Sequence, residues 1–113
     1  MTKSLSDQIK KTILGEQYEL SLVFVSAQKI RNLNKVYRGV DKSTDILSFP
    51  LSKTSGEIFI CKTEARKMMK EFGRPYENFL AFLFIHGCVH LKGFDHSNEM
   101  EKVEEKWRKL FKI

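Results

Sequence analysis

All three histidines of the chain fall between positions 86 and 96, in the order His-Gly-Cys-Val-His-Leu-Lys-Gly-Phe-Asp-His. His86 and His90 are four residues apart, so on a helix both rings project from one face. Gly93 can adopt the left-handed conformation that ends a helix, and the resulting turn would bring His96 to the same point. Three imidazole nitrogens leave the fourth position of a tetrahedral metal open, as catalytic sites do. We therefore predict a metal site made by His86, His90 and His96.

Zinc is the ion that this ligand set suits best, at one ion per chain. Imidazole also binds other divalent transition metals, such as nickel, copper or iron. The two cysteines, Cys61 and Cys88, lie in apolar segments. We expect them to be buried free thiols, with a disulfide as the weaker alternative.

The histidine spacing also matches that of metallopeptidases, which place a glutamate directly after the first histidine. That glutamate takes the proton of the metal-bound water. This chain has Gly87 there. A peptidase is therefore the less favoured interpretation.

The elements before the histidines are predicted from apolar spacing. A helix is expected over residues 5–14, with Ser4 as its cap and Gly15 as its end. A strand is expected over residues 19–25, buried on both faces. Ser26 can cap a helix that ends near Gly39. The apolar positions of that helix are Ile30, Leu33, Val36 and Tyr37.

Two further strands, over residues 45–51 and 57–61, should form a hairpin, with Pro50 at an edge or at a strand end. A helix capped by Thr63 should run to Phe72. Residues 76–91 are apolar almost all round, which predicts a helix buried in the core, including Phe79, Phe82 and Phe84. The last helix should start after Ser97 or Asn98. Its expected core stripe is Met100, Val103, Trp107, Leu110 and Phe111, and the pairs Glu104–Arg108 and Glu105–Lys109 should lie outside.

These elements predict an α+β fold: a small mixed β-sheet packed with helices, and the metal site at the end of a buried central helix. At 113 residues, the chain (1–113) is expected to form a single domain. It has no apolar run long enough for a membrane span and no secretion signal, which predicts a cytoplasmic protein without membrane contact. The formal net charge of +6 favours nucleic acid or ribosomes as partners.

A second motif runs from Asn32 to Pro50 (NLNKVYRGVDKSTDILSFP). Together with the histidine segment and the strand Gly56-Glu57-Ile58, it closely resembles the YbeY family of bacterial rRNA-maturation endoribonucleases. The resemblance covers about residues 20–110. It implies an α+β fold, zinc on the three histidines, and cleavage of single-stranded RNA in small-subunit rRNA 3′-end maturation and ribosome quality control. The implied partners are rRNA, the small subunit and its assembly factors.

The resemblance places the essential arginine of the family at Arg38. A planar guanidinium can grip a phosphate with two hydrogen bonds and offset the charge that builds on it. The alternative is a surface arginine paired with Asp41. Lys29, Arg31, Lys35 and Lys42 are either a basic track for RNA or ordinary solvated residues.

Asp95 either hydrogen-bonds a histidine ligand or caps the last helix. Thr44, Asp45 and Ser48 are expected to be structural. The chain departs from the family at its short N-terminus, so its sheet is expected to be one strand short. It also departs at Glu57, Val89 and Phe94, none of which is a predicted ligand.

The sequence thus predicts a zinc-dependent, single-strand-specific endoribonuclease that uses Arg38 and the three histidines. A non-catalytic, metal-stabilised ribosome-assembly factor is the first alternative, and a metallopeptidase is the second. The oligomeric state, the general base and the cleavage site are left open.

Overall fold

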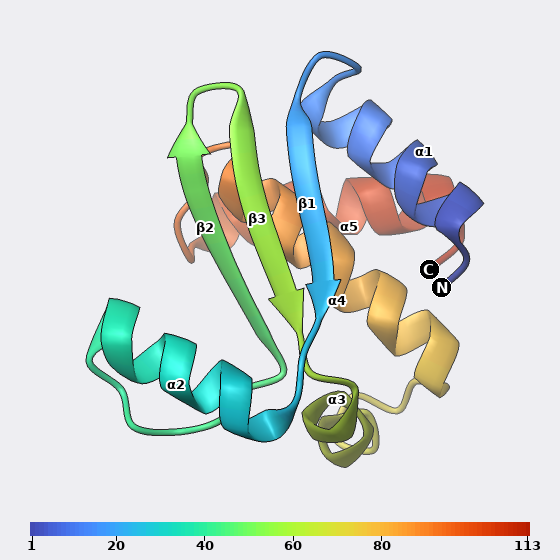
Figure 1. The fold of residues 1–113 in the computed structure, drawn as a ribbon. Helices are drawn as coiled ribbons and strands as arrows, with labels where there is room; N and C mark the ends of the chain where they lie inside the picture. The colour runs from blue at the N-terminus through green and yellow to red at the C-terminus, as the bar shows by residue number, and fades with distance from the viewer.

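The structure, a computed structural model, describes residues 1–113. It contains five helices and one three-stranded sheet (Figure 1). The elements in chain order are α1 (Lys3–Leu14), β1 (Glu19–Phe24), α2 (Ala27–Arg38), β2 (Ile46–Ser52), β3 (Ser55–Ile60), α3 (Lys62–Met68), α4 (Tyr76–Leu91) and α5 (Asn98–Phe111). This is the α+β fold with a small mixed sheet that the sequence predicts.

The sheet has the strand order β1-β3-β2. β2 and β3 form the expected antiparallel hairpin, and β1 pairs in parallel with β3. Pro50 therefore lies on an edge strand, where a residue without a backbone N–H does not cost the sheet a hydrogen bond between central strands. β1 also lies at an edge, and the prediction that it is buried on both faces is wrong: Val23 and Phe24 are 37% and 43% exposed.

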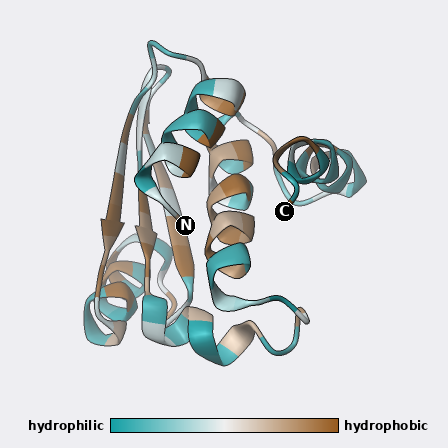
Figure 2. Ribbon diagram, turned by 90° about the vertical axis from the view of Figure 1, so that its right-hand side faces the viewer, coloured by the Kyte–Doolittle hydropathy of each residue, from teal (hydrophilic) through white to brown (hydrophobic).

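One face of the sheet carries α1 and α4, with α5 packed on the far side of α4 (Figure 2). The helix α4 has the predicted bounds, and nine of its 16 residues are buried. It supplies most of the main core cluster, which also takes in Ile9 and Ile13 of α1 and Ile58 and Ile60 of β3. Because α4 is apolar all round, it can be covered by the sheet on one side and by helices on the other.

The opposite face of the sheet is covered only in part, by α2. A smaller core of Ile30, Leu47 and Cys61 lies beneath this helix. As predicted, α2 is capped by Ser26 and ends at Gly39. Val36 and Tyr37 do not join this core, because they are 74% and 67% exposed.

Some predicted helix ends are wrong. The first helix is capped by Thr2 rather than Ser4, and the third starts after Cys61 without a side-chain cap and ends at Met68 rather than Phe72. Ser97 caps the last helix by accepting a hydrogen bond from the backbone N–H of Met100. No helix of the structure combines the length and apolar character that a bilayer crossing requires.

Gly87 marks the closest approach of α4 to the sheet. A Cβ at this position would lie 2.9 Å from Ile58 Cδ1, 2.9 Å from Ser48 Oγ and 3.1 Å from Ile46 Cδ1. Position 87 therefore faces the sheet, and any side chain there would have to displace the ends of these three side chains. The glutamate of the metallopeptidase pattern could not act there, which removes the structural basis for the peptidase interpretation.

Candidate metal centre

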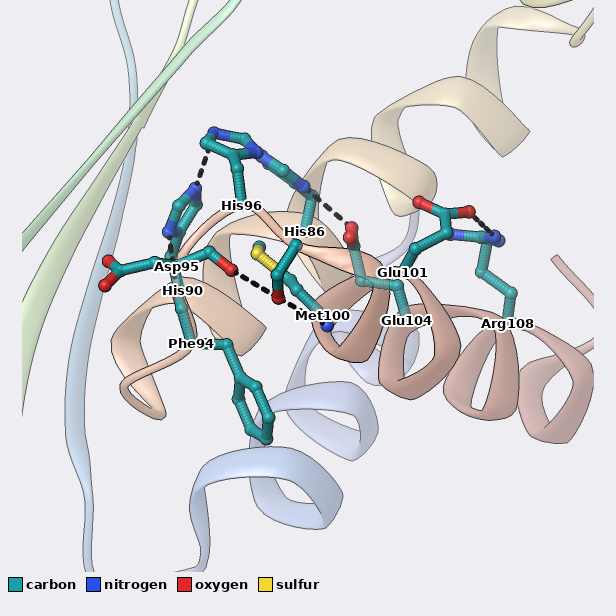
Figure 3. Close-up of polar contacts among 10 residues, drawn as sticks. His86, His90, Phe94, Asp95, His96, Met100, Glu101, Glu104 and Arg108 are labelled. Atoms are coloured by element: carbon teal, nitrogen blue, oxygen red, sulfur yellow. Dashed lines mark hydrogen bonds and ion pairs between the residues drawn. The ribbon is translucent and has the colours of Figure 1, made fainter.

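The three histidines converge at the C-terminal end of α4 (Figure 3). One ligand atom from each of His86, His90 and His96 lies within 4.8 Å of the other two. The ring centroids are 4.8 Å apart for His86 and His90, and 4.7 Å apart for His90 and His96. The structure thus brings together all three predicted ligands, and they form a cluster that could hold a metal ion.

The turn after α4 delivers His96 as the sequence predicts. Gly93 has a φ of 111°, a conformation that L side chains rarely adopt. Its N–H donates to the carbonyl of His90, which closes the end of the helix. The chain then reverses, and His96 reaches the other two rings from the loop before α5.

Hydrogen bonds fix the orientation of two of the rings. Nδ1–H of His90 donates to the carbonyl oxygen of Phe94 at 3.1 Å, and Nδ1–H of His86 donates to the Glu104 carboxylate at 2.7 Å. Because each of these rings carries its proton on Nδ1, its free lone pair lies on Nε2. An acceptor on the second ring nitrogen is the usual companion of a metal-binding histidine.

The spacing of the Nε2 atoms suits a metal ion. Nε2 of His90 lies 3.3 Å from Nε2 of His96. Two nitrogens bound to one tetrahedral ion at about 2.0–2.1 Å are roughly 3.3–3.4 Å apart. Burial, with a contribution from the nearby His86 and His96, lowers the pKa of His90 below its ordinary value. The ring is therefore neutral at physiological pH, which is the form that binds metals.

Glu104 is the site residue that the sequence interpretation missed. It was expected to lie outside and pair with Arg108, but only 5% of its side chain is exposed, and Arg108 pairs with Glu101 instead. The signal was present, because Glu104 follows Met100 by four residues and so belongs to the buried stripe of α5. Leu110, which was assigned to that stripe, is 58% exposed. The expected pair Glu105–Lys109 is formed.

Asp95 has neither of its expected roles. Its side chain is exposed and makes no hydrogen bond to a histidine ring, and its backbone carbonyl accepts from the hydroxyl of Ser97, which is the actual cap of α5. The acceptors on the rings are instead Glu104 and the Phe94 carbonyl.

A cavity of about 380 Å³ opens beside the cluster. Its lining includes His86, His96, Glu104 and Asp45. Asp45 was expected to be structural, and its backbone carbonyl does accept from the N–H of Cys61. Its carboxylate is half-buried, and that burial raises its pKa above the ordinary value. The cavity gives the histidine cluster a concave approach from solvent.

Arg38 lies at the end of α2 against the free edge of the sheet. Its guanidinium donates to the carbonyl of Ser48 in β2 at 3.1 Å. The side chain of Ser48 points to the other side, where its Oγ borders Gly87, next to His86. The sheet edge therefore stands between Arg38 and the start of the histidine segment.

The expected alternative partner of Arg38 is taken by another residue. Arg31 donates to Asp41 at 2.8 Å, and this contact lowers the pKa of Asp41. Arg38 makes no ion pair, so its charge is free for an anion. Lys29, Lys35 and Lys42 are exposed on or near the same helix.

The fold and the site together define a small α+β protein with a cluster of three histidines, suited to a metal ion, at the end of a buried helix. The profile of a family described as Endoribonuclease YbeY matches residues 1–112. The chain is 36% identical over 107 residues to Endoribonuclease YbeY of Staphylococcus carnosus, covering 84% of this chain and 70% of that protein. It is 40% identical over 102 residues to the Alkaliphilus metalliredigens protein of the same name, covering 80% and 66%.

The same relationship is visible in three dimensions. The solution structure of TM1509 from Thermotoga maritima superposes with a TM-score of 0.69 at 32% sequence identity, covering 96% of this chain and 77% of that one. The chain belongs to the YbeY endoribonuclease family. It is an endoribonuclease by homology, and its class of substrate is RNA.

Proposed function

We propose that this chain is a zinc-dependent, single-strand-specific endoribonuclease that acts in the cytoplasm on the 3′ end of small-subunit rRNA and in ribosome quality control. The observation that carries the proposal is the pairing of two features: three histidine nitrogens within 4.8 Å of one another, and an arginine without a carboxylate partner at the adjacent sheet edge. The first suits a metal ion and the second suits a phosphate.

In this proposal, His86, His90 and His96 hold one zinc ion through Nε2. When bound, the ion supplies Lewis acidity to the oxygen atoms at the scissile phosphate. Glu104 and the Phe94 carbonyl hold two of the rings in the required tautomer. The protein thus contributes a preorganised donor set that needs little rearrangement.

Arg38 would bind the scissile phosphate. A guanidinium offers two parallel N–H donors to phosphate oxygens, and it stays charged at any physiological pH. Its present contact with the Ser48 carbonyl is a single neutral acceptor, which a phosphate can replace. The exposed lysines of α2 would attract the RNA strand at long range.

The proposed partners are single-stranded RNA, rRNA, the small subunit and its assembly factors. The main alternative is a non-catalytic assembly factor whose metal only stabilises the fold. An exposed ligand beside an open cavity favours the enzyme, because structural zinc sites are closed by four protein ligands.

The test is cleavage of end-labelled rRNA precursor by wild type, Arg38→Ala, Arg38→Lys and His90→Ala. Loss of one electrostatic partner of the transition state should cost Arg38→Ala about 10²–10³ in rate while its zinc content stays normal. His90→Ala should lose zinc and activity together. Arg38→Lys keeps the charge but not the two-pronged grip, so it should fall well short of wild type.

Full activity of Arg38→Ala would remove this residue from the mechanism. Absence of cleavage by zinc-loaded wild type, with retained binding to the small subunit, would favour the assembly factor. The ends of the products identify the nucleophile. Attack by water gives a 5′-phosphate, and attack by the ribose 2′-hydroxyl gives a 2′,3′-cyclic phosphate.

A further inference from the structure

A second cavity, of about 240 Å³, lies on the sheet face that α2 covers only in part. Leu33 and Phe59 form its apolar lining, Tyr37 and Phe49 are its aromatic walls, and Glu57 brings a carboxylate. It is separate from the cavity beside the histidines, with which it shares no lining residue. Nothing in the proposed cleavage step uses it.

The aromatic walls offer a stacking surface. The ring centroids of Tyr37 and Phe49 are 5.2 Å apart, with their planes at 52°. Tyr37 is 67% exposed, so its ring does not serve the core. Exposed aromatic rings beside a basic surface are the usual means by which proteins hold the bases of single-stranded nucleic acid.

Glu57 is the one charged group of this cavity. It lies on the central strand β3, next to Phe49 of β2, and is half-buried. Its carboxylate makes no ion pair or hydrogen bond within the chain, so both oxygens are free to accept hydrogen bonds from a ligand. Such a group points to a ligand that supplies N–H donors.

Arg38 connects this cavity to the proposed cleavage site. Its guanidinium carbon lies 5.6 Å from the centre of the Phe49 ring, and it also donates to the Ser48 carbonyl at the sheet edge. A phosphate held by Arg38 would therefore have an aromatic cavity beside it. The base of the same or the neighbouring nucleotide is aromatic, so it is the part of the RNA that suits such a cavity.

We propose that the Tyr37–Phe49–Glu57 cavity binds one unpaired base of the RNA next to the phosphate on Arg38, and that it prefers guanine. This inference rests on the proposed function. The Watson–Crick edge of guanine presents two adjacent donors, N1–H and N2–H, which match the two oxygens of a carboxylate. Adenine and cytosine each place an acceptor beside their single amino group, which a carboxylate repels.

The test is the affinity of metal-free protein for short oligouridylates that carry one central guanosine, inosine or adenosine. Without metal the RNA stays intact, so binding is measured apart from cleavage. Guanosine should bind roughly 5- to 100-fold more tightly than adenosine, as for other two-pronged base contacts. Inosine lacks the 2-amino group and should lie between them.

Two variants separate stacking from selection. Tyr37→Ala should weaken binding of all three oligonucleotides by about fivefold or more, whereas Tyr37→Phe keeps the ring and should bind like wild type. Glu57→Gln should bring the guanosine-to-adenosine ratio close to one, since an amide presents one donor and one acceptor. Thermal unfolding should be unchanged for Tyr37→Ala, because the side chain is largely exposed.

Equal affinity for the three bases, together with no effect of Tyr37→Ala, would overturn the base site even if rRNA is cleaved normally. Guanosine-selective binding that Glu57→Gln removes would support the site even if zinc-loaded protein cleaves no RNA. Absence of cleavage by the zinc-loaded protein would contradict the proposed nuclease function but not the base site.

Discussion

Nδ1 of His86 lies 2.7 Å from a carboxylate oxygen of Glu104, although the two residues are 18 positions apart and come from different helices. This contact ties α5 to the end of α4 at the histidine cluster. It fixes the ring so that Nε2 faces the other two histidines. The packing of α5 on α4 therefore also sets the orientation of a predicted metal ligand.

Removal of this carboxylate should weaken zinc binding. Glu104→Ala leaves Nδ1 of His86 without its acceptor, and loss of such a contact typically costs about 10- to 100-fold in metal affinity. Glu104→Gln should lose less, since an amide oxygen can still accept from Nδ1–H. Competition with a chromogenic zinc chelator measures both. Glu105→Gln, which changes an exposed neighbour paired with Lys109, is the matched control. Wild-type zinc affinity in Glu104→Ala would mean that the contact serves only helix packing.

Zinc should raise the melting temperature of the wild-type protein. A ligand that binds only the folded state, at a hundred times its Kd, adds about 2.7 kcal/mol of stability, which is a shift of several degrees for a chain of this size. His90→Ala should show no such shift. Asp95→Ala should keep it, because Asp95 is exposed and contacts no ring. Differential scanning calorimetry measures the melting temperatures. Equal zinc-dependent shifts in His90→Ala and wild type would place the zinc elsewhere.

A side chain at position 87 should destabilise the fold. Gly87→Ala puts a methyl group 2.9 Å from Ile58 Cδ1, and such overpacking typically costs about 1–3 kcal/mol. Urea unfolding measures the loss. In the double variant Gly87→Ala with Ile58→Val, the opposing methyl is removed. Its loss in free energy of unfolding should therefore be smaller than the sum of the two single losses. Strict additivity would show that the collision is relieved in another way. Gly87→Glu should unfold the protein rather than produce peptidase activity.

Both cysteines should resist thiol reagents in the folded protein. Cys61 and Cys88 are free and have no exposed surface, and burial raises the pKa of Cys88 far above its usual range. Because the reactive species is the thiolate, raising the pH to 8 should not label Cys88 until the chain unfolds. Mass spectrometry after alkylation, with and without urea, gives the count. Fast labelling of Cys88 in the native protein would contradict its burial and indicate local opening of α4.

The sequence was most informative where one local rule decides the structure. The unbroken apolar run predicted α4 with its observed bounds, and Ser26 and Gly39 predicted the limits of α2. The spacing of the histidines predicted their convergence, since a helix and one glycine turn are enough to bring them together. These features depend on neighbours within a few residues.

Features that depend on distant contacts were predicted less well. Glu104 fits two patterns, an exposed pair with Arg108 and the stripe that contains Met100, and the docking of α5 on α4 decides for burial. The edge position of β1 depends on the strand order, which apolar content does not reveal. Tyr37 fits a core stripe by spacing, yet its side chain is 67% exposed and meets the sheet at Phe49 of the edge strand β2. The single domain stays a prediction, and the oligomeric state, which the sequence left open, is a question for solution measurements.

The mixed strand order also bears on how the chain folds. Only Lys53 and Thr54 separate β2 from β3, whereas Glu19 of β1 meets its partner Ser55 across all of α2 and β2. Closing the longer loop costs more chain entropy, so the hairpin should form first and β1 should join it late. The sheet residues that border Gly87 belong to that hairpin. The support of the metal centre can thus assemble before the sheet is complete, and substitutions in β1 should mainly speed unfolding rather than slow folding.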